Sequence, residues 1–326
     1  MRIPKLSHIL ISTVLLSVSC SKDSDNEPNN PQTDGPDTEN PETGKPETGE
    51  AERAKAKQLY ADYYEASRDT GSEVSWTGNE PNCQPGTIPQ DTRDKIFLRL
   101  SYFRKAVGLN NEIAENSSKS EKAQKAALMM HANGTLSHEP PNDWKCFSED
   151  GKQAAQNSVL TSTRNAGAID SYMRDQGQEN YPVGHRRWLL WPRLQEIGVG
   201  NTSSYNAVWV LGNPGERPAD APEFIAWPPK GYLPKQLAYS RWSFSIAKTD
   251  FARTEISMTT KTGENIGLET EQLKDGFGDG TIVWRPSVDT NSLAEDTAFI
   301  ISLKNVDVDG ETKNFEYEVV LFDVTR

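Results

Sequence analysis

The middle of the chain, from residue 51 to about 212, carries apolar residues at helical spacing. They recur every three or four positions in four segments, which predicts amphipathic helices over Ala51–Asp69, Asp91–Val107, Ser120–Asn133 and about Asn165–Gln176. Gly108, Gly134 and Gly177 follow three of these segments, where helices commonly end. Two short strand candidates come later, Glu196–Asn201 and Asn206–Leu211. Helices that flank a small sheet predict an α-β-α layered arrangement.

Beyond residue 235 the pattern changes to alternation of apolar and polar positions, which indicates strands. The clearest examples are Trp242–Ile246, Glu255–Thr259, Phe299–Leu303 and Phe315–Phe322. About six strands over roughly a hundred residues predict an immunoglobulin-like all-β sandwich at 235–326. A Pro-rich bridge, 213–234, separates the two patterns. The length after residue 50 favours two domains, 51–212 and 235–326.

The first twenty residues have the pattern of an export signal. Basic residues precede a short apolar run, Ile9–Val18, that is too short to span a bilayer. Small residues then lead to Cys20. The segment resembles a bacterial lipoprotein signal, cleaved before Cys20 and acylated there, although the usual leucine stands one place early, at Leu16. The alternative is an ordinary cleaved signal that leaves Cys20 as a free thiol.

Residues 21–50 are interpreted as a disordered acidic tether. They include no aromatic or aliphatic side chain and so cannot bury a core. Nine acids against two lysines carry seven of the chain's twelve net negative charges. The remainder is only mildly acidic, which argues against a nucleic-acid partner. The acidic Ser21–Asp25 resembles the tag of some Gram-negative lipoproteins, and predicts a surface-exposed outer-membrane lipoprotein held to the membrane through Cys20.

Cysteine usage fits an exported protein. With Cys20 assigned to lipid, Cys83 and Cys146 remain, and an even number of cysteines in an oxidising compartment predicts a disulfide. The alternative is a metal site or a catalytic thiol. Neither cysteine has a neighbouring histidine or a CxxC partner, which disfavours that alternative.

Histidines are scarce, and three follow the signal segment. His131 lies inside the alanine-rich helix, where a structural role is expected. His138 follows the end of that helix in a Pro-rich loop. His185 opens a short apolar helix before Pro192. An imidazole in either of the last two places can donate or accept a proton or bind a metal.

Three segments around these histidines resemble the bacterial form of the CAP superfamily, which comprises cysteine-rich secretory proteins, venom antigens and plant pathogenesis-related proteins with an SCP-like domain. The likeness is carried by Ala132–His138, Val183–Leu190 and Gln195–Gly200, and covers about residues 90–212. It implies an α-β-α sandwich with a surface cleft centred on two histidines and two acids. The expected fold class is therefore α+β, a CAP/SCP-like domain followed by an immunoglobulin-like sandwich.

His138 and His185 match the family's two histidines, and its two acids fall best on Gln156 and Asp175. Gln156 departs from the family because it carries no charge. With Asp175, the histidines can hold Zn²⁺ or Mg²⁺ in an open three-ligand arrangement. Alternatively, Gln156 bridges the imidazoles by neutral hydrogen bonds, and no cofactor is required. Glu139, beside His138, is a further acid.

The resemblance implies a tethered binding module rather than an enzyme, with a cleft for a small ligand, lipid, peptide or divalent metal. Three aromatic residues near His185 can form an apolar wall or pack in the core: Tyr181, Trp188 and Trp191.

Two other functions remain open. One is a peptidase-like or esterase-like hydrolase in which His138 or His185 activates water or the hydroxyl of Ser137 or Ser158. The chain has neither Gly-x-Ser-x-Gly nor His-Glu-x-x-His, which disfavours it. The other is a structural surface adhesin built from both domains.

Overall fold

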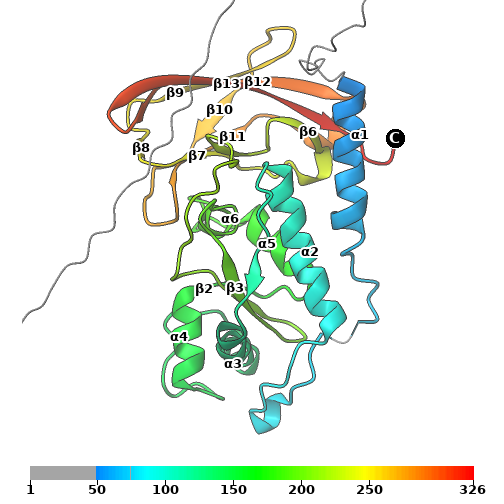
Figure 1. Ribbon diagram of the computed structural model, residues 1–326, viewed down its shortest axis with the longest axis vertical. Coiled ribbons are helices and arrows are strands. Elements are labelled where there is room, and N and C mark those ends of the chain that lie inside the picture. Colours follow the sequence, from blue (N-terminus) through cyan, green and yellow to red (C-terminus); the bar gives the residue numbers. More distant parts are fainter. Residues whose placement is uncertain (1–48, 74) are drawn as a thin grey trace, which may run out of the picture. The chain divides into compact units, whose positions relative to one another are not determined.

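The computed structural model describes residues 49–73 and 75–326 (Figure 1). The expected signal segment, Cys20 and the tether up to residue 48 lie outside the described residues. All described residues belong to one compact unit. Among its helices, none has both the length and the apolar character that a membrane span requires.

The first half of the described chain contains a four-stranded sheet, of which Figure 1 labels β2 and β3. Its strand order is β1-β3-β4-β2, with β1 parallel to β3 and the other pairs antiparallel. The strands are β1 (Ala114–Glu115), β2 (Ser158–Thr161), β3 (Glu196–Asn201) and β4 (Asn206–Trp209). The helices are α2 (Gln90–Ala106), α3 (Ser117–Asn133), α4 (Glu149–Asn157), α5 (Gly167–Arg174) and α6 (Gly184–Leu189).

Alternation along β2 and β4 sends apolar side chains into two cores. Leu160 and Ala207 pack with the small residues of α3 and α4. Val159 and Val208 face the opposite way, into a larger core that includes residues of α2, α5 and α6. The sheet is therefore covered on both faces, and the predicted α-β-α arrangement of an α+β protein is confirmed.

Two glycines of β3 allow α3 to lie directly on the sheet. A Cβ at Gly198 would stand 2.4 Å from Lys119, and one at Gly200 would stand 2.1 Å from the carbonyl oxygen of Ala123. Real carbon atoms do not approach so closely. The Gly-Val-Gly sequence is thus required by the helix–strand distance.

The C-terminal region is rich in antiparallel strands, which form two sheets in a sandwich-like arrangement. One has the order β10-β11-β7-β5, and the other has the order β6-β13-β12-β8, with β9 also paired to β12. Their bounds are β5 (Ile225–Trp227), β6 (Gly231–Pro234), β7 (Trp242–Ile246), β8 (Thr249–Asp250), β9 (Glu255–Thr260), β10 (Leu268–Thr270), β11 (Gly280–Pro286), β12 (Thr297–Val308) and β13 (Glu311–Phe322).

Several elements differ from the sequence-based predictions. The expected helix at 51–69 is α1 (Gly49–Leu59) followed by a π-helical turn, η1 (Tyr60–Glu65). Helix α4 was not predicted, because its buried residues are only glycine and alanine and give little apolar signal. The 213–234 stretch is more than a bridge, because β5 and β6 lie in it and pair with β7 and β13.

The expected boundary at 213–234 does not separate two hydrophobic cores. One buried cluster contains residues from α2 and from β7, β11, β12 and β13. Trp227 illustrates the continuity, because its ring lies 5.2 Å from that of Phe103 and 6.3 Å from that of Tyr239. Helix α1 packs on the C-terminal strands as well, with the Arg53 guanidinium 4.9 Å from the Phe322 ring. The two regions are therefore parts of one packed body.

Candidate functional site

His138 lies in the loop after α3, and its imidazole is anchored on α4. Its Nδ1 lies 2.8 Å from the carbonyl oxygen of Ala155. A carbonyl can only accept, so Nδ1 carries the proton and donates it. The neutral ring then has its lone pair on Nε2. His138 is exposed, so this acceptor is available at the surface.

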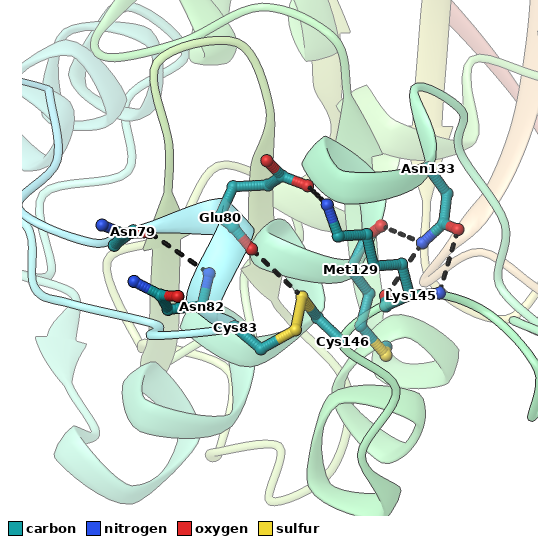
Figure 2. The surroundings of a disulfide bond; sticks show 8 residues. All are labelled: Asn79, Glu80, Asn82, Cys83, Met129, Asn133, Lys145 and Cys146. Atoms are coloured by element: carbon teal, nitrogen blue, oxygen red, sulfur yellow. Dashed lines mark hydrogen bonds and ion pairs between the residues drawn. A yellow bond between two sulfur atoms is a disulfide. The ribbon is translucent and has the colours of Figure 1, made fainter.

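The loop that carries His138 is fastened at both ends. Gly134, in the left-handed conformation, ends α3. Further along, Cys146 is bonded to Cys83, which gives the disulfide expected from the sequence (Figure 2). Asn133 clamps the same loop, because its side chain donates to the Lys145 carbonyl at 3.0 Å and accepts from the Lys145 N–H at 3.1 Å. These contacts hold the His138 loop against the end of α3.

His185 begins helix α6 and is paired with Asp175, which ends α5. Asp175 Oδ1 lies 2.7 Å from His185 Nδ1, and Oδ2 accepts from the His185 backbone N–H at 2.9 Å. Oδ2 also accepts from the Arg186 N–H at 3.3 Å. The Asp175 side chain is fully buried, whereas that of His185 is 23% exposed. The carboxylate thus fixes the direction of the imidazole and satisfies the first N–H groups of α6.

The two imidazoles are therefore held in the same way. Each ring is anchored through Nδ1, by a carbonyl at His138 and by a carboxylate at His185. In the neutral form each ring keeps an acceptor lone pair on Nε2. The two expected histidines present equivalent nitrogens for a ligand.

Gln156 does not contact the imidazoles as one sequence-based alternative expected. It is exposed, and its Nε2 donates to both carboxylate oxygens of Glu139, at 3.0 and 3.2 Å. Glu139 follows His138 directly, so this pair places a negative charge beside the first imidazole. Glu139 thus adds carboxylate acceptors next to His138 in the chain.

Asp175 is not placed to act as the third metal ligand. Both of its oxygens are used by His185 and Arg186, and its side chain is buried. Within 49–73 and 75–326, no group of three or more His, Cys, Asp or Glu side chains is arranged to hold a metal ion.

Tyr172 connects the His185 ring to strand β2. The His185 ring packs against Tyr172, with centroids 5.6 Å apart, and the Tyr172 hydroxyl donates to the carbonyl of Val159. His138 is anchored four residues earlier, at Ala155. Four residues of extended chain span at most about 14 Å. His138 is thus bonded directly to α4, whereas His185 is connected to β2 only through Tyr172.

Neither serine of the hydrolase alternative is paired with an imidazole in the described chain. The Ser137 hydroxyl oxygen accepts from the Glu139 N–H at 3.0 Å. Ser158 is buried, and its hydroxyl has no hydrogen-bond partner. A nucleophile activated by a base requires the two groups within hydrogen-bonding reach. His131 contacts a hydroxyl, that of Thr202 at 3.0 Å, but Thr202 is fully buried.

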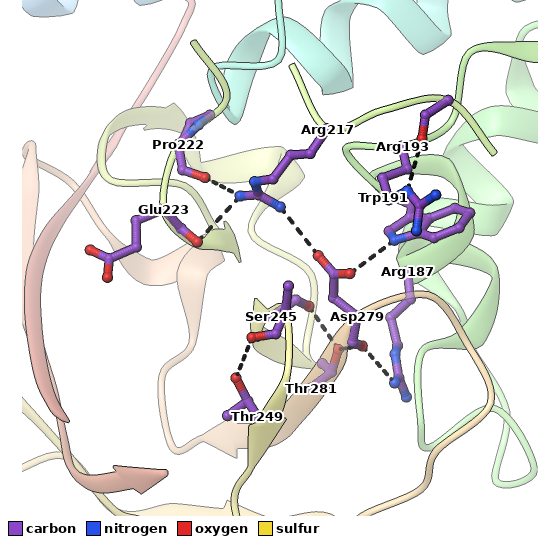
Figure 3. A network of polar contacts seen from close by, with 12 residues as sticks. Arg187, Trp191, Arg193, Arg217, Pro222, Glu223, Ser245, Thr249, Asp279 and Thr281 are labelled. Carbon is purple, nitrogen blue, oxygen red and sulfur yellow. Dashed lines mark hydrogen bonds and ion pairs between the residues drawn. The ribbon is translucent and has the colours of Figure 1, made fainter. Parts of the chain in front are cut away.

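The three aromatic residues near His185 have separate surroundings. Trp191 donates from Nε1 to Asp279 Oδ1 at 2.9 Å, and Figure 3 shows Asp279 between Trp191 and Arg217. Trp188 packs edge-on against Trp191, with centroids 5.4 Å apart. Tyr181 instead lines an open groove of about 540 Å³ together with Arg241 and other polar residues. The tryptophans therefore pack against the core, as the core-packing alternative holds.

Sequence reasoning missed the contribution of the C-terminal region. Arg241 donates to the carbonyls of Asp175 and Gly177, and a Cβ on Gly184 would stand 2.7 Å from the Phe277 ring. These residues lie more than sixty positions from their partners, and no local motif marks them. The surroundings of His185 thus include Arg241 and Phe277, which lie outside the segment that resembles the family.

Comparison with known families agrees with the geometry of the first half. The family model described as CAP, the cysteine-rich secretory protein family, matches residues 98–212. This range contains His138, His185 and all four strands of the first sheet. No curated protein matches the chain.

Proposed function

Residues 98–212 form a domain of the CAP, or cysteine-rich secretory protein, family, and from this premise we propose that the chain is a binding module whose two imidazoles receive a ligand rich in hydrogen-bond donors. The observation that carries the proposal is the common anchoring of His138 and His185 through Nδ1. Because Nδ1 is occupied in both rings, both Nε2 atoms act as acceptors.

The charge around His138 favours a peptide or small molecule that carries amine or amide N–H groups. Glu139 adds a carboxylate next to His138. The Gln156 amide donates to that carboxylate and holds it in place. Three acceptors with a negative charge attract cationic or donor groups and repel anions. The same Nε2 atoms can take Zn²⁺, which makes the metal a convenient probe that competes with such a ligand.

Two measurements test the proposal: whether the purified protein carries a bound ligand, and whether Zn²⁺ binding requires the two histidines. Native mass spectrometry of the full chain, purified without added metal, should detect a bound peptide or small molecule. Zn²⁺ titration followed by calorimetry should show binding that His138→Ala combined with His185→Ala abolishes. The thermal midpoint should stay close to that of the wild type, because both rings are partly exposed.

His131→Ala is the control, because His131 is half-buried like His185 but is bonded to Thr202. It should leave Zn²⁺ binding unchanged. Unfolding of the double variant would show that the histidines serve the fold, and Zn²⁺ binding that survives it would place the site elsewhere. Turnover of peptide or ester substrates that the double variant loses would favour the hydrolase instead.

We further propose that the chain is exported and anchored through lipid on Cys20. The short apolar run that ends shortly before Cys20 supports this proposal, as does the Cys83–Cys146 disulfide, which suits an oxidising compartment. Metabolic labelling with an alkyne fatty acid should tag the wild type and leave Cys20→Ser untagged. A tagged Cys20→Ser variant, or an untagged wild type in the membrane-free fraction, would contradict lipidation.

A further inference from the structure

The segment between Asp175 and His185 begins and ends on a backbone conformation that non-glycine residues avoid. Asp175 has φ of 52° and Val183 has φ of 48°, both in the left-handed region. A β-branched residue such as Val183 is rarely found there. Such conformations persist only where surrounding contacts enforce them. The contacts that enforce them here therefore bear directly on the position of His185.

Arg241, which immediately precedes β7, supplies contacts at the first of these positions. Its Nη1 donates to the Asp175 carbonyl at 2.8 Å, and its Nη2 donates to the Gly177 carbonyl at 2.9 Å. Its Nε donates to Glu271 Oε1 at 2.9 Å, which orients the guanidinium from behind. The planar fork of arginine can satisfy this set of three acceptors, whereas an ammonium group cannot match its geometry.

The main chain of Arg241 reaches the other side of the histidine. Its carbonyl accepts from Arg186 Nη1 at 2.8 Å, and Arg186 Nε donates to the Met173 carbonyl on α5 at 2.7 Å. Arg186 follows His185 and is fully buried, and burial lowers its pKa to about 10, so it remains protonated at neutral pH. Arg241 thus holds both Asp175 and the residue next to His185.

The rest of α6 is enclosed by the segment between β10 and β11. The Phe277 ring fills the space next to Gly184, and the Arg187 guanidinium lies 5.3 Å from the same ring. Arg187 Nη2 donates to the Asp279 carbonyl at 3.0 Å, and Asp279 Oδ1 accepts from Trp191 (Figure 3). The helix that presents His185 therefore has its position set by the C-terminal region.

We propose that Arg241 is a positioning residue for His185, acting through Asp175, so that the C-terminal region is a working part of the histidine site rather than a spacer. This inference rests on the proposed function, because it concerns the same imidazole. Loss of the guanidinium releases the Asp175 carbonyl, the Asp175 carboxylate moves away from Nδ1, and the Nε2 acceptor is no longer fixed in direction.

The test compares Arg241→Gln with Arg285→Gln in the full chain. Arg285 is the matched control, because it also pairs with Glu271, at 3.1 Å, but is partly exposed on β11. In long-range ¹H–¹⁵N spectra, the wild type should show His185 as a single tautomer with the proton on Nδ1. Arg241→Gln should mix the two tautomers and weaken Zn²⁺ binding about tenfold or more, whereas Arg285→Gln should change neither.

Two further results keep the test decisive. Arg241→Lys retains the charge but not the planar guanidinium, and it replaces Arg241→Gln in the test if that variant fails to fold. It should give a tautomer population between those of the wild type and a fully mixed state. If the wild type takes up no Zn²⁺, the binding proposal fails while the tautomer comparison still decides the role of Arg241. A single Nδ1–H tautomer and unchanged Zn²⁺ affinity in a folded Arg241→Gln protein would overturn the inference.

Discussion

Asp175 and His185 are joined twice, because one carboxylate oxygen meets the imidazole Nδ1 at 2.7 Å and the other accepts from the His185 backbone N–H at 2.9 Å. A buried acid that directs a partly exposed imidazole is a common way to fix the tautomer of a ligand-binding histidine. Aspartate is one methylene shorter than glutamate, and Asp175 still reaches the histidine because it stands at the end of α5, where the first residues of α6 contact it.

Asp175→Asn should disturb the site while leaving its shape intact. An amide has one acceptor oxygen, so its NH₂ group must face either Nδ1 or the backbone N–H of His185. Facing Nδ1 would move the imidazole proton to Nε2 and turn the acceptor into a donor. We expect Zn²⁺ affinity to fall about 10–100-fold and unfolding free energy to fall by about 1–3 kcal/mol.

Calorimetry and denaturant titration measure these two effects. Asp143→Asn, an exposed aspartate in the loop after His138, is the control and should leave both values unchanged. Wild-type Zn²⁺ affinity in Asp175→Asn would show that the carboxylate does not orient the ring.

Gly200→Ala should destabilise the sheet–helix packing. The new methyl group would stand 2.1 Å from the Ala123 carbonyl oxygen, so α3 would have to move away from β3. Overpacking of this kind costs about 1–3 kcal/mol, and a clash with backbone belongs at the upper end. Gly167→Ala is the control, because the nearest atom to its Cβ is the methyl of Thr163 at 3.4 Å. Equal denaturation midpoints for the two variants would contradict the close approach.

Removal of the disulfide should lower stability without changing the fold. Cys83 and Cys146 are separated by 63 positions. Closing a loop of that length stabilises a protein by about 4 kcal/mol in the chain-entropy model. The Cys83→Ser, Cys146→Ser variant should therefore melt at lower temperature than the wild type. Dithiothreitol should lower the wild-type midpoint and leave that of the variant unchanged, and a wild type insensitive to reductant would refute this account.

Glu73 should contribute to the loss of stability in acid. The side-chain hydrogen bond from Lys95, followed by the Thr70 backbone N–H, holds its pKa well below the ordinary value of 4.5. A depressed pKa stabilises the fold at every pH above the ordinary value, and this stabilisation is lost as the pH falls through the folded-state pKa. Glu73→Gln should therefore be less stable than the wild type at neutral pH.

The difference in unfolding free energy between the wild type and Glu73→Gln should shrink steadily as the pH is lowered below about 4.5, because the wild-type carboxylate becomes protonated. Denaturant titrations at a series of pH values measure it. Glu264→Gln changes an exposed turn after β9 and is the control. Its unfolding free energy should depend on pH in the same way as that of the wild type. If the unfolding free energy of Glu73→Gln also follows the pH dependence of the wild type, Glu73 is excluded as a source of acid sensitivity.

The sequence by itself determined the features that depend on neighbours along the chain. Helical spacing located α2, Gly134 marked the end of α3, and alternation located β7, because burial on one face leaves a period that can be recognised locally. The resemblance of three short segments likewise singled out His138 and His185 as candidates, and their role as ligand-binding residues stays a prediction. Local order and residue type were sufficient for these features.

Only the tertiary structure decided how the site is assembled. Gln156 is hydrogen-bonded to Glu139, and Asp175 is hydrogen-bonded to His185. Arg241 donates to the Asp175 carbonyl from a strand region that the resemblance does not cover. Periodicity reports that a side chain is buried but not which distant segment covers it. Polar partners are chosen by hydrogen-bond geometry in three dimensions, where residues far apart in sequence become neighbours.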